Sequence, residues 1–212
     1  VYRHLGMAVL ASSKPRVVIL PGNGCDDLVG ANWYLWMAER LRAEGRFSEV
    51  VARTMPDPHM AKRKVWLPFI VGALTADEHT VLVGHSSGAV AAMRFLEDYP
   101  ARGAVLVSAC HTDLGDAGER ASGYYPPSGG PWQWEKMRSN AGASGGNIAV
   151  LHSDNDPFIP LHEAQHVASC LEVPLRVVPG RSHFFKPCEE LIEAVYHVAF
   201  PSGQGELPDV DS

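Results

Sequence analysis

Short apolar runs alternate along this chain with longer segments in which apolar residues recur every three or four positions. The short runs are rich in β-branched residues, which is typical of strands buried on both faces. The longer segments carry helix start and stop signals, such as Asn32 before one of them and Gly45 after it. This alternation predicts an α/β fold, a three-layer sandwich in which helices cover both faces of a mainly parallel six-stranded sheet. The predicted strands are 16–20, 49–53, 80–84, 103–109, 147–152 and 174–180, and the predicted helices are 32–45, 61–74 (interrupted at Pro68), 87–99, 160–171 and 188–200.

The alternation breaks between residues 111 and 146, where glycine and proline are frequent and aromatic residues cluster. We expect a long excursion there, partly helical near Trp134. A single domain is predicted over 16–200, with a flexible leader over 1–15 and a disordered, acidic tail over 201–212.

One strand runs directly into Gly84-His85-Ser86-Ser87-Gly88 and from there directly into an alanine-rich helix. The pattern G-x-S-x-G between a strand and a helix is typical of a nucleophile elbow. Such a tight turn requires a positive φ at Ser86, and it brings neighbouring backbone so close that Gly84 and Gly88 must lack side chains. The hydroxyl of Ser86 should therefore be exposed as a nucleophile.

A serine hydroxyl needs a base, and the base needs a carboxylate that orients it. Asp156 follows the fifth predicted strand and His183 follows the sixth, which gives the chain order Ser, Asp, His. Because the carboxyl ends of parallel strands meet at one edge of the sheet, we expect Ser86, Asp156 and His183 to form a catalytic triad there.

The loop after the first strand, "LPGNGCDD", is expected to complete an oxyanion hole together with the backbone amide of Ser87. The backbone N–H of Asn23 is the preferred second donor, with Gly22 or Gly24 as alternatives. Two other interpretations of this loop stay open at this point. Its glycines could bind a dinucleotide, although two carboxylates follow them, and Cys25 could be a nucleophile.

A competing motif is "HEAQH", His162 to His166, which matches the H-E-x-x-H pattern of zinc proteases. Its helix is expected to lie on the outside of the sheet, and a third ligand would have to come from Glu189, Glu190 or Glu193. We therefore predict no metal site.

The net charge of −6 and the absence of a basic run longer than Lys62-Arg63-Lys64 disfavour a nucleic-acid partner. No apolar stretch reaches the roughly 18 residues of a membrane span. The four cysteines form no C-x-x-C pair, which favours reduced thiols in a cytoplasmic protein that could also enter the nucleus. We expect a monomer.

The stretches "VILPGNG", "GHSSGAVAAMR", "ERASGY", "PWQWEK", "DPFIP" and "SHF" resemble the retinoblastoma-binding protein 9 group of small serine hydrolases, over about residues 16–200. The resemblance implies a compact α/β-hydrolase with little or no lid, the triad Ser86, Asp156 and His183, and no cofactor. It also implies reactivity toward fluorophosphonate probes.

That group is named for binding the retinoblastoma protein through an L-x-C-x-E stretch. Here the corresponding residues are Leu74-Thr75-Ala76-Asp77-Glu78, without the cysteine, so we expect weak binding or none.

The sequence thus predicts a serine hydrolase acting on small esters or amides, with a small acyl compound as its substrate. The alternative is a protein-binding module on a hydrolase scaffold. Trp132 and Trp134 are expected to line the acyl pocket, unless they only anchor the excursion on the core.

Overall fold

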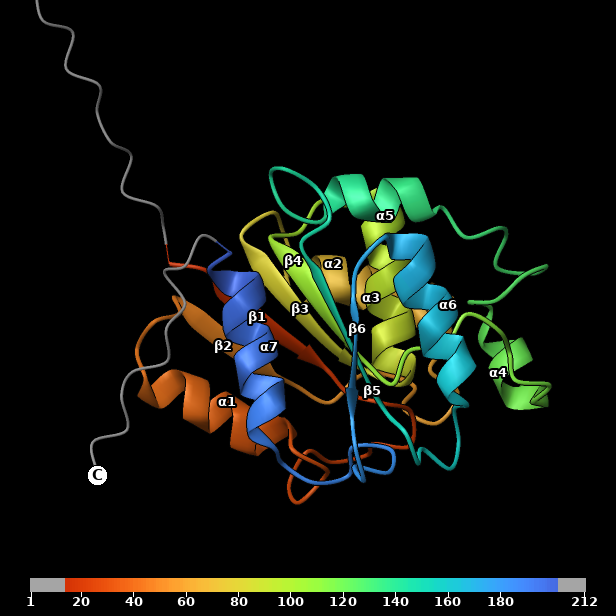
Figure 1. The fold of residues 1–212 in the computed structure, drawn as a ribbon, viewed down its shortest axis with the longest axis horizontal. Helices are drawn as coiled ribbons and strands as arrows, with labels where there is room; N and C mark the ends of the chain where they lie inside the picture. Colours follow the sequence, from red (N-terminus) through yellow and green to blue (C-terminus); the bar gives the residue numbers. More distant parts are fainter. Residues whose placement is uncertain (1–13, 202–212) are drawn as a thin grey trace, which may run out of the picture.

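Six parallel strands form one sheet in the order β2-β1-β3-β4-β5-β6 in the computed structural model, which describes residues 14–201 (Figure 1). The strands are β1 Arg16–Leu20, β2 Glu49–Ala52, β3 Thr80–His85, β4 Gly103–Val107, β5 Ile148–Ser153 and β6 Leu175–Val178. The helices are α1 Tyr34–Ala43, α2 Arg63–Gly72, α3 Ser87–Asp98, α4 Ala117–Ser122, α5 Trp134–Asn140, α6 Leu161–Leu171 and α7 Glu189–Ala199. The predicted fold class is confirmed, while most of the predicted leader and tail lies outside the described residues.

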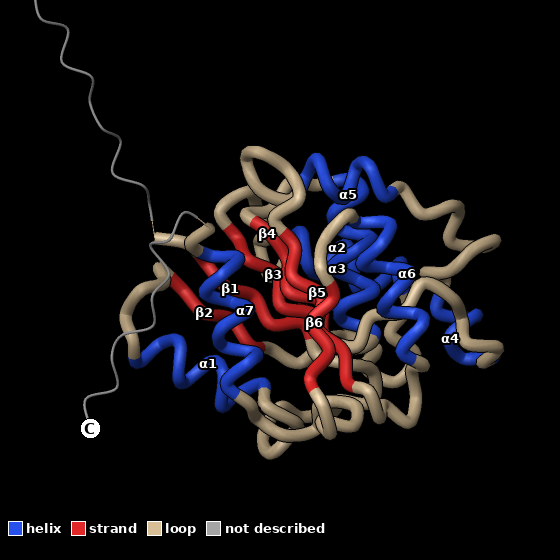
Figure 2. Tube along the Cα trace, viewed as in Figure 1, coloured by secondary structure: helices blue, strands red, loops and turns tan. Residues whose placement is uncertain are grey.

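The two faces of the sheet are buried by different helices, as Figure 2 shows. Alternate residues of β1 point to opposite faces, so Val17 and Ile19 pack with α1 and α7, whereas Val18 and Leu20 pack with α2 and α3. The interior strands β1, β3, β4 and β5 are thus buried on both faces, which explains why the sequence shows continuous apolar runs there, whereas the edge strands β2 and β6 carry exposed residues. Among the described helices, none is long and apolar enough to cross a membrane.

The strand order places the loops that carry polar residues next to one another. The chain runs outward from β1 to β2 and then returns to β3 on the other side of β1, so the direction of winding changes between β1 and β3. Leu20 pairs with Gly84, and His85 pairs with Val107, which aligns the carboxyl ends of three strands. Ligands bind at such a switch point in open α/β sheets.

Two helical predictions need correction. Pro68 does not interrupt α2; it lies on the exposed face, as does Lys64, the residue whose carbonyl it leaves without a helical partner. The excursion contains the helix α4, which the sequence analysis missed. Its signals were an Asp116 N-cap that accepts the amide of Glu119, and Gly123 in the left-handed conformation after the last turn.

Candidate active site

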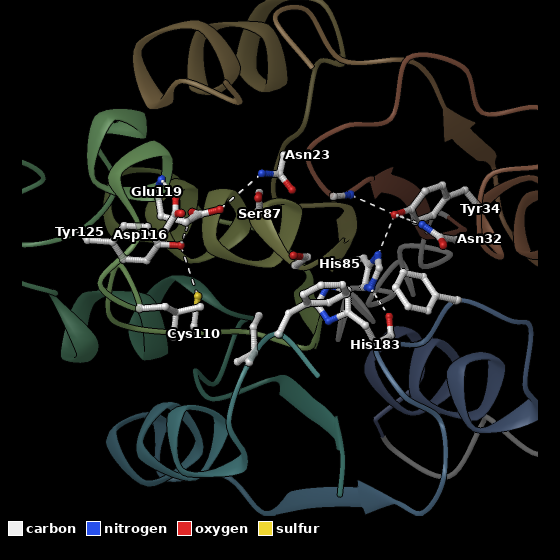
Figure 3. Close-up of a pocket in the computed structure, with 16 residues that line it drawn as sticks. Asn23, Asn32, Tyr34, His85, Ser87, Cys110, Asp116, Glu119, Tyr125 and His183 are labelled. Carbon is white, nitrogen blue, oxygen red and sulfur yellow. Dashed lines mark hydrogen bonds between the residues drawn. The ribbon is translucent and has the colours of Figure 1, made fainter. Parts of the chain in front are cut away.

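A cavity of about 620 Å³ opens at the carboxyl edge of the sheet (Figure 3). Its walls come from the loops after β1, β3, β5 and β6 and from the excursion that follows β4. Ser86 and His183 both line it, as do Asn23 and Ser87. The excursion supplies one wall through Leu114, Asp116, Glu119 and Tyr125, and so borders the cavity directly.

Ser86 occupies the strained turn that the sequence predicts, with φ 55° and ψ −122° immediately before α3. The turn is held by a hydrogen bond of 2.9 Å from the Ser86 amide to the carbonyl of Val107 on β4. A Cβ on Gly84 would lie 2.5 Å from the Gly88 carbonyl oxygen, so the backbone of these two glycines is as close as the sequence predicts. A Cβ on Gly88 would instead reach 2.1 Å from the carbonyl oxygen of Leu20, which shows that β1 also requires this glycine.

Asp156 and His183 form a buried pair, with 2.8 Å between Asp156 Oδ2 and His183 Nδ1. Asp156 Oδ2 also accepts from the Ser108 hydroxyl at 2.9 Å, while Oδ1 accepts the amides of Phe158 and Ile159 at 2.9 and 3.1 Å. Burial alone would raise the pKa of Asp156, but the hydrogen bond and charge of His183 and these two amides hold the pKa below its usual value. The carboxylate is thus kept ionised and aimed at the imidazole.

The rings of Phe158 and Phe185 flank the His183 ring at centroid distances of 5.1 and 5.7 Å. Both phenylalanines line the cavity together with Ser86. No hydrogen bond joins the Ser86 hydroxyl to His183 within residues 14–201, although the two side chains face the same cavity. Nucleophile–base contacts are commonly long before substrate binds and shorten in the reacting complex.

The structure separates the three candidate amides of the loop after β1. The Gly22 amide donates to the Tyr34 hydroxyl at 3.0 Å, and the Gly24 amide donates to the carbonyl of Pro58 at 2.8 Å. In the described part of the chain, the amides of Asn23 and Ser87 have no hydrogen-bond partner. Of the candidate oxyanion donors, these two amides therefore remain able to donate to a substrate oxygen.

Cys25, the alternative nucleophile in the same loop, is buried and does not line the cavity. Burial raises the pKa of its thiol, and the carboxylates of Asp26 and Asp27 raise it further. A thiolate is thus disfavoured at this position.

The far wall of the cavity is acidic. Glu119 accepts the Tyr125 hydroxyl at 3.0 Å and the Asn23 side-chain amide at 3.4 Å, and Asp116 lies beside it (Figure 3). Burial is the main cause that raises the pKa of Glu119, and the hydroxyl of Tyr125 opposes the shift. This wall is absent from the sequence predictions, although the Asp116–Glu119 capping pattern gave a local signal.

Trp132 and Trp134 do not line this cavity, so the prediction that they form the acyl pocket is wrong. Trp132 covers the guanidinium of Arg94, with 3.7 Å from Cζ to the ring centroid, and stacks on Trp134. Arg94 is itself buried, pairs with Glu97 at 2.6 Å and donates to the carbonyl of Tyr124. The two indoles thus anchor the excursion on α3, which was the alternative interpretation.

Two residues of the "HEAQH" stretch, Glu163 and His166, make structural contacts. Glu163 is buried in α6 and accepts the amides of His111 and Thr112 at 2.9 and 3.1 Å, as well as the Thr112 hydroxyl. His111 Nδ1 also lies 2.7 Å from Glu163 Oε2, and the His111 ring stacks on His166. Among residues 14–201, no group of three or more His, Cys, Asp or Glu is placed to hold a metal ion.

Comparisons with known proteins identify the family of the chain. A family described as "Serine hydrolase" matches residues 17–188. The chain is 41% identical to the Rattus norvegicus protein named "Serine hydrolase RBBP9" over 192 residues, which cover 90% of this chain and 99% of that relative. It is 27% identical to the protein YdeN of Bacillus subtilis (strain 168) over 160 residues, which cover 73% of this chain and 79% of that relative.

Solved structures share the fold. The crystal structure of the ydeN gene product from B. subtilis superposes with a TM-score of 0.72 at 24% identity, over 87% of this chain and 98% of that one. The structure of esterase PE8 superposes with a TM-score of 0.56 at 16% identity, over 89% and 92% of the two chains.

Proposed function

The chain belongs to the serine hydrolase family, and from this premise we propose that it cleaves small esters or amides through an acyl-enzyme on Ser86. The observation that carries the proposal is the hydrogen-bonded Asp156–His183 pair, whose imidazole opens onto the cavity beside a serine at φ 55°. An orienting carboxylate, an imidazole and an exposed hydroxyl are the parts that acyl transfer requires.

Each group has one role in the proposed reaction. Asp156 accepts a hydrogen bond from the Nδ1 N–H of His183, which leaves the Nε2 lone pair free to take the proton of Ser86. The serine oxygen then bonds to the substrate carbonyl carbon, and the carbonyl oxygen takes up negative charge. The free amides of Asn23 and Ser87 donate to that oxygen. His183 passes the proton to the leaving group, and a water molecule activated by His183 then releases the acyl group from Ser86.

The acidic wall suggests which substrates are preferred. Asp116 and Glu119 lie on the other side of Asn23 and Ser87 from His183 (Figure 3). A substrate whose reacting carbonyl lies between these amides would direct one end of its chain toward two carboxylates. We propose that this end carries a positive charge, because carboxylates attract a cation and repel an anion.

Hydrolysis of matched aryl esters and anilides, with acyl chains that end in either a methyl or an ammonium group, tests the proposal. We expect measurable kcat/KM for the wild type, and about a fivefold preference for the ammonium member of each pair, from roughly 1 kcal/mol of partly screened attraction. Glu119→Gln should remove most of that preference. Glu135→Gln, an exposed change on α5, should keep it.

Two outcomes would count against these assignments. Hydrolysis that survives in Ser86→Ala would reject Ser86 as the nucleophile. An unchanged preference in Glu119→Gln would reject the cation-binding wall and leave the hydrolase assignment intact.

The four cysteines are free thiols in the described structure, which supports a protein of a reducing compartment such as the cytosol. We propose that the protein is a monomer in the cytosol.

The protein-binding alternative is not favoured. Leu74, the first residue of the L-x-A-x-E stretch, is buried in the core, and Asp77 accepts the hydroxyl of Thr80 at 2.7 Å. Binding through this stretch would require Leu74 to leave the core. We therefore propose that the chain does not bind the retinoblastoma protein in this way.

A further inference from the structure

A continuous chain of hydrogen bonds runs beneath the candidate active site (Figure 3). The Gly22 amide lies 3.0 Å from the Tyr34 hydroxyl, and that hydroxyl lies 2.6 Å from His85 Nδ1. His85 Nε2 lies 2.9 Å from the carbonyl oxygen of His183. Asn32 also donates its side-chain amide to the Tyr34 hydroxyl at 2.9 Å. The chain of contacts thus starts in the loop after β1 and ends in the loop after β6.

The direction of every bond follows from chemistry. A carbonyl oxygen only accepts, so His85 Nε2 must carry the proton that it shares with His183. A neutral imidazole then accepts at Nδ1, so the Tyr34 hydroxyl donates to it. The tyrosine oxygen keeps its acceptor capacity for the amides of Gly22 and Asn32. Each proton has one acceptor, and the network requires a neutral His85.

Burial preserves that neutral form. Tyr34 and His85 are 0% and 2% exposed. Burial, aided by the charge of neighbouring His183, lowers the pKa of His85 to about 3, so this imidazole stays uncharged at neutral pH. The His85 and His183 rings are 4.8 Å apart between centroids. A neutral His85 therefore avoids repulsion when His183 takes up a proton.

The network joins the three loops that supply the proposed chemistry. Gly22 precedes Asn23, whose amide is a proposed oxyanion donor, and His85 precedes Ser86. The last acceptor belongs to His183 itself. We infer that Tyr34 and His85 are positioning residues, which hold the Asn23 amide and the His183 imidazole at a fixed spacing across the nucleophile. This inference rests on the proposed function.

The test is Tyr34→Phe, which removes one oxygen atom and leaves the ring in place. Without that oxygen, the Gly22 amide loses its acceptor and His85 loses its donor. We expect kcat to fall about tenfold or more, with KM changed by less than about twofold, because the lost positioning matters most in the transition state. Benzeneboronic acid, which mimics the tetrahedral state, should bind Tyr34→Phe more weakly by a similar factor.

The matched control is Tyr196→Phe. Tyr196 is also a buried tyrosine, on α7, and its hydroxyl has no hydrogen-bond partner among residues 14–201. Its kcat and boronate affinity should stay within about twofold of wild type. Thermal unfolding of both variants separates lost stability from lost positioning.

Nitrogen-15 NMR of the imidazole gives a readout that does not depend on activity. His85 should show an Nε2-protonated tautomer that does not titrate between about pH 5 and about pH 9. Titration of His85 in that range, or an active wild type with an equally active Tyr34→Phe, would overturn the positioning role. A wild type that neither hydrolyses esters nor binds the boronate would instead reject the proposed function.

Discussion

Asp156→Asn is expected to lower kcat by about 10⁴-fold while the protein remains folded. The reason is the pattern of contacts around this carboxylate. The amides of Phe158 and Ile159 both donate to Oδ1, so an asparagine would place its oxygen there and its NH₂ group toward His183. His183 Nδ1 would then accept a hydrogen bond, the ring proton would move to Nε2, and no lone pair would face Ser86. His183→Ala should cause a loss at least as large, because it removes the base itself.

Steady-state kinetics with an aryl ester measure this effect. Asp154→Asn is a suitable control, because it lies two residues away and accepts the Gly180 amide at 2.8 Å instead of contacting His183. It should retain most of the activity. An Asp156→Asn variant with more than about a tenth of wild-type kcat would contradict the assigned role of Asp156.

Asp156→Asn should also change how the stability of the protein depends on pH. The pKa of Asp156 is lowered on folding, so its ionised form stabilises the native state above the ordinary pKa of an aspartate, about 3.9. That contribution disappears as pH falls through the lowered pKa. The stability difference between wild type and Asp156→Asn should therefore be largest near neutral pH and shrink in acid.

Gly88→Ala is expected to prevent formation of the native fold or to destabilise it by several kcal/mol. The added Cβ would lie 2.1 Å from the Leu20 carbonyl oxygen and 2.6 Å from that of Pro21, and real Cβ contacts are never that short. Both neighbours are backbone atoms at the end of β1, a central strand, so neither can rotate away as a side chain could.

Circular dichroism during thermal unfolding measures the effect of this change. Gly72→Ala is the matched control, because a Cβ at the end of α2 would meet no atom within 4 Å. Alanine there should stabilise the protein by about 0.5–1 kcal/mol. A Gly88→Ala variant that unfolds at the wild-type temperature would show that the packing of the elbow on β1 is not as described.

The sequence predicted those features that depend on neighbouring residues. The four interior strands are buried on both faces, so their positions could be inferred from continuous apolar runs in the sequence. The elbow is likewise a local object, since a strand that runs into a helix at Ser86 requires Gly84 and Gly88. Asp156 and His183 follow the last two strands in the sequence. The rule that parallel strands share one functional edge then predicts that these two residues lie near Ser86.

The sequence could not predict contacts between distant segments. The hydrogen bond between Tyr34 and His85 joins residues 51 positions apart, and no local sequence pattern predicts it. Distant contacts also decide between the candidate oxyanion donors, because Tyr34 engages the Gly22 amide and Pro58 engages the Gly24 amide, which leaves the Asn23 amide free. Trp132 looked like a pocket residue because aromatic side chains suit either role, and only the buried guanidinium of Arg94 assigns it to the core.

The central claim, a reactive hydroxyl at Ser86, is tested most directly by peptide mass spectrometry after reaction with a fluorophosphonate. One adduct per chain is predicted, on the peptide that contains Ser86, with no adduct in Ser86→Ala and a normal one in Ser139→Ala. An adduct on Ser87, Ser108 or Cys25, or an unmodified wild type, would contradict the claim.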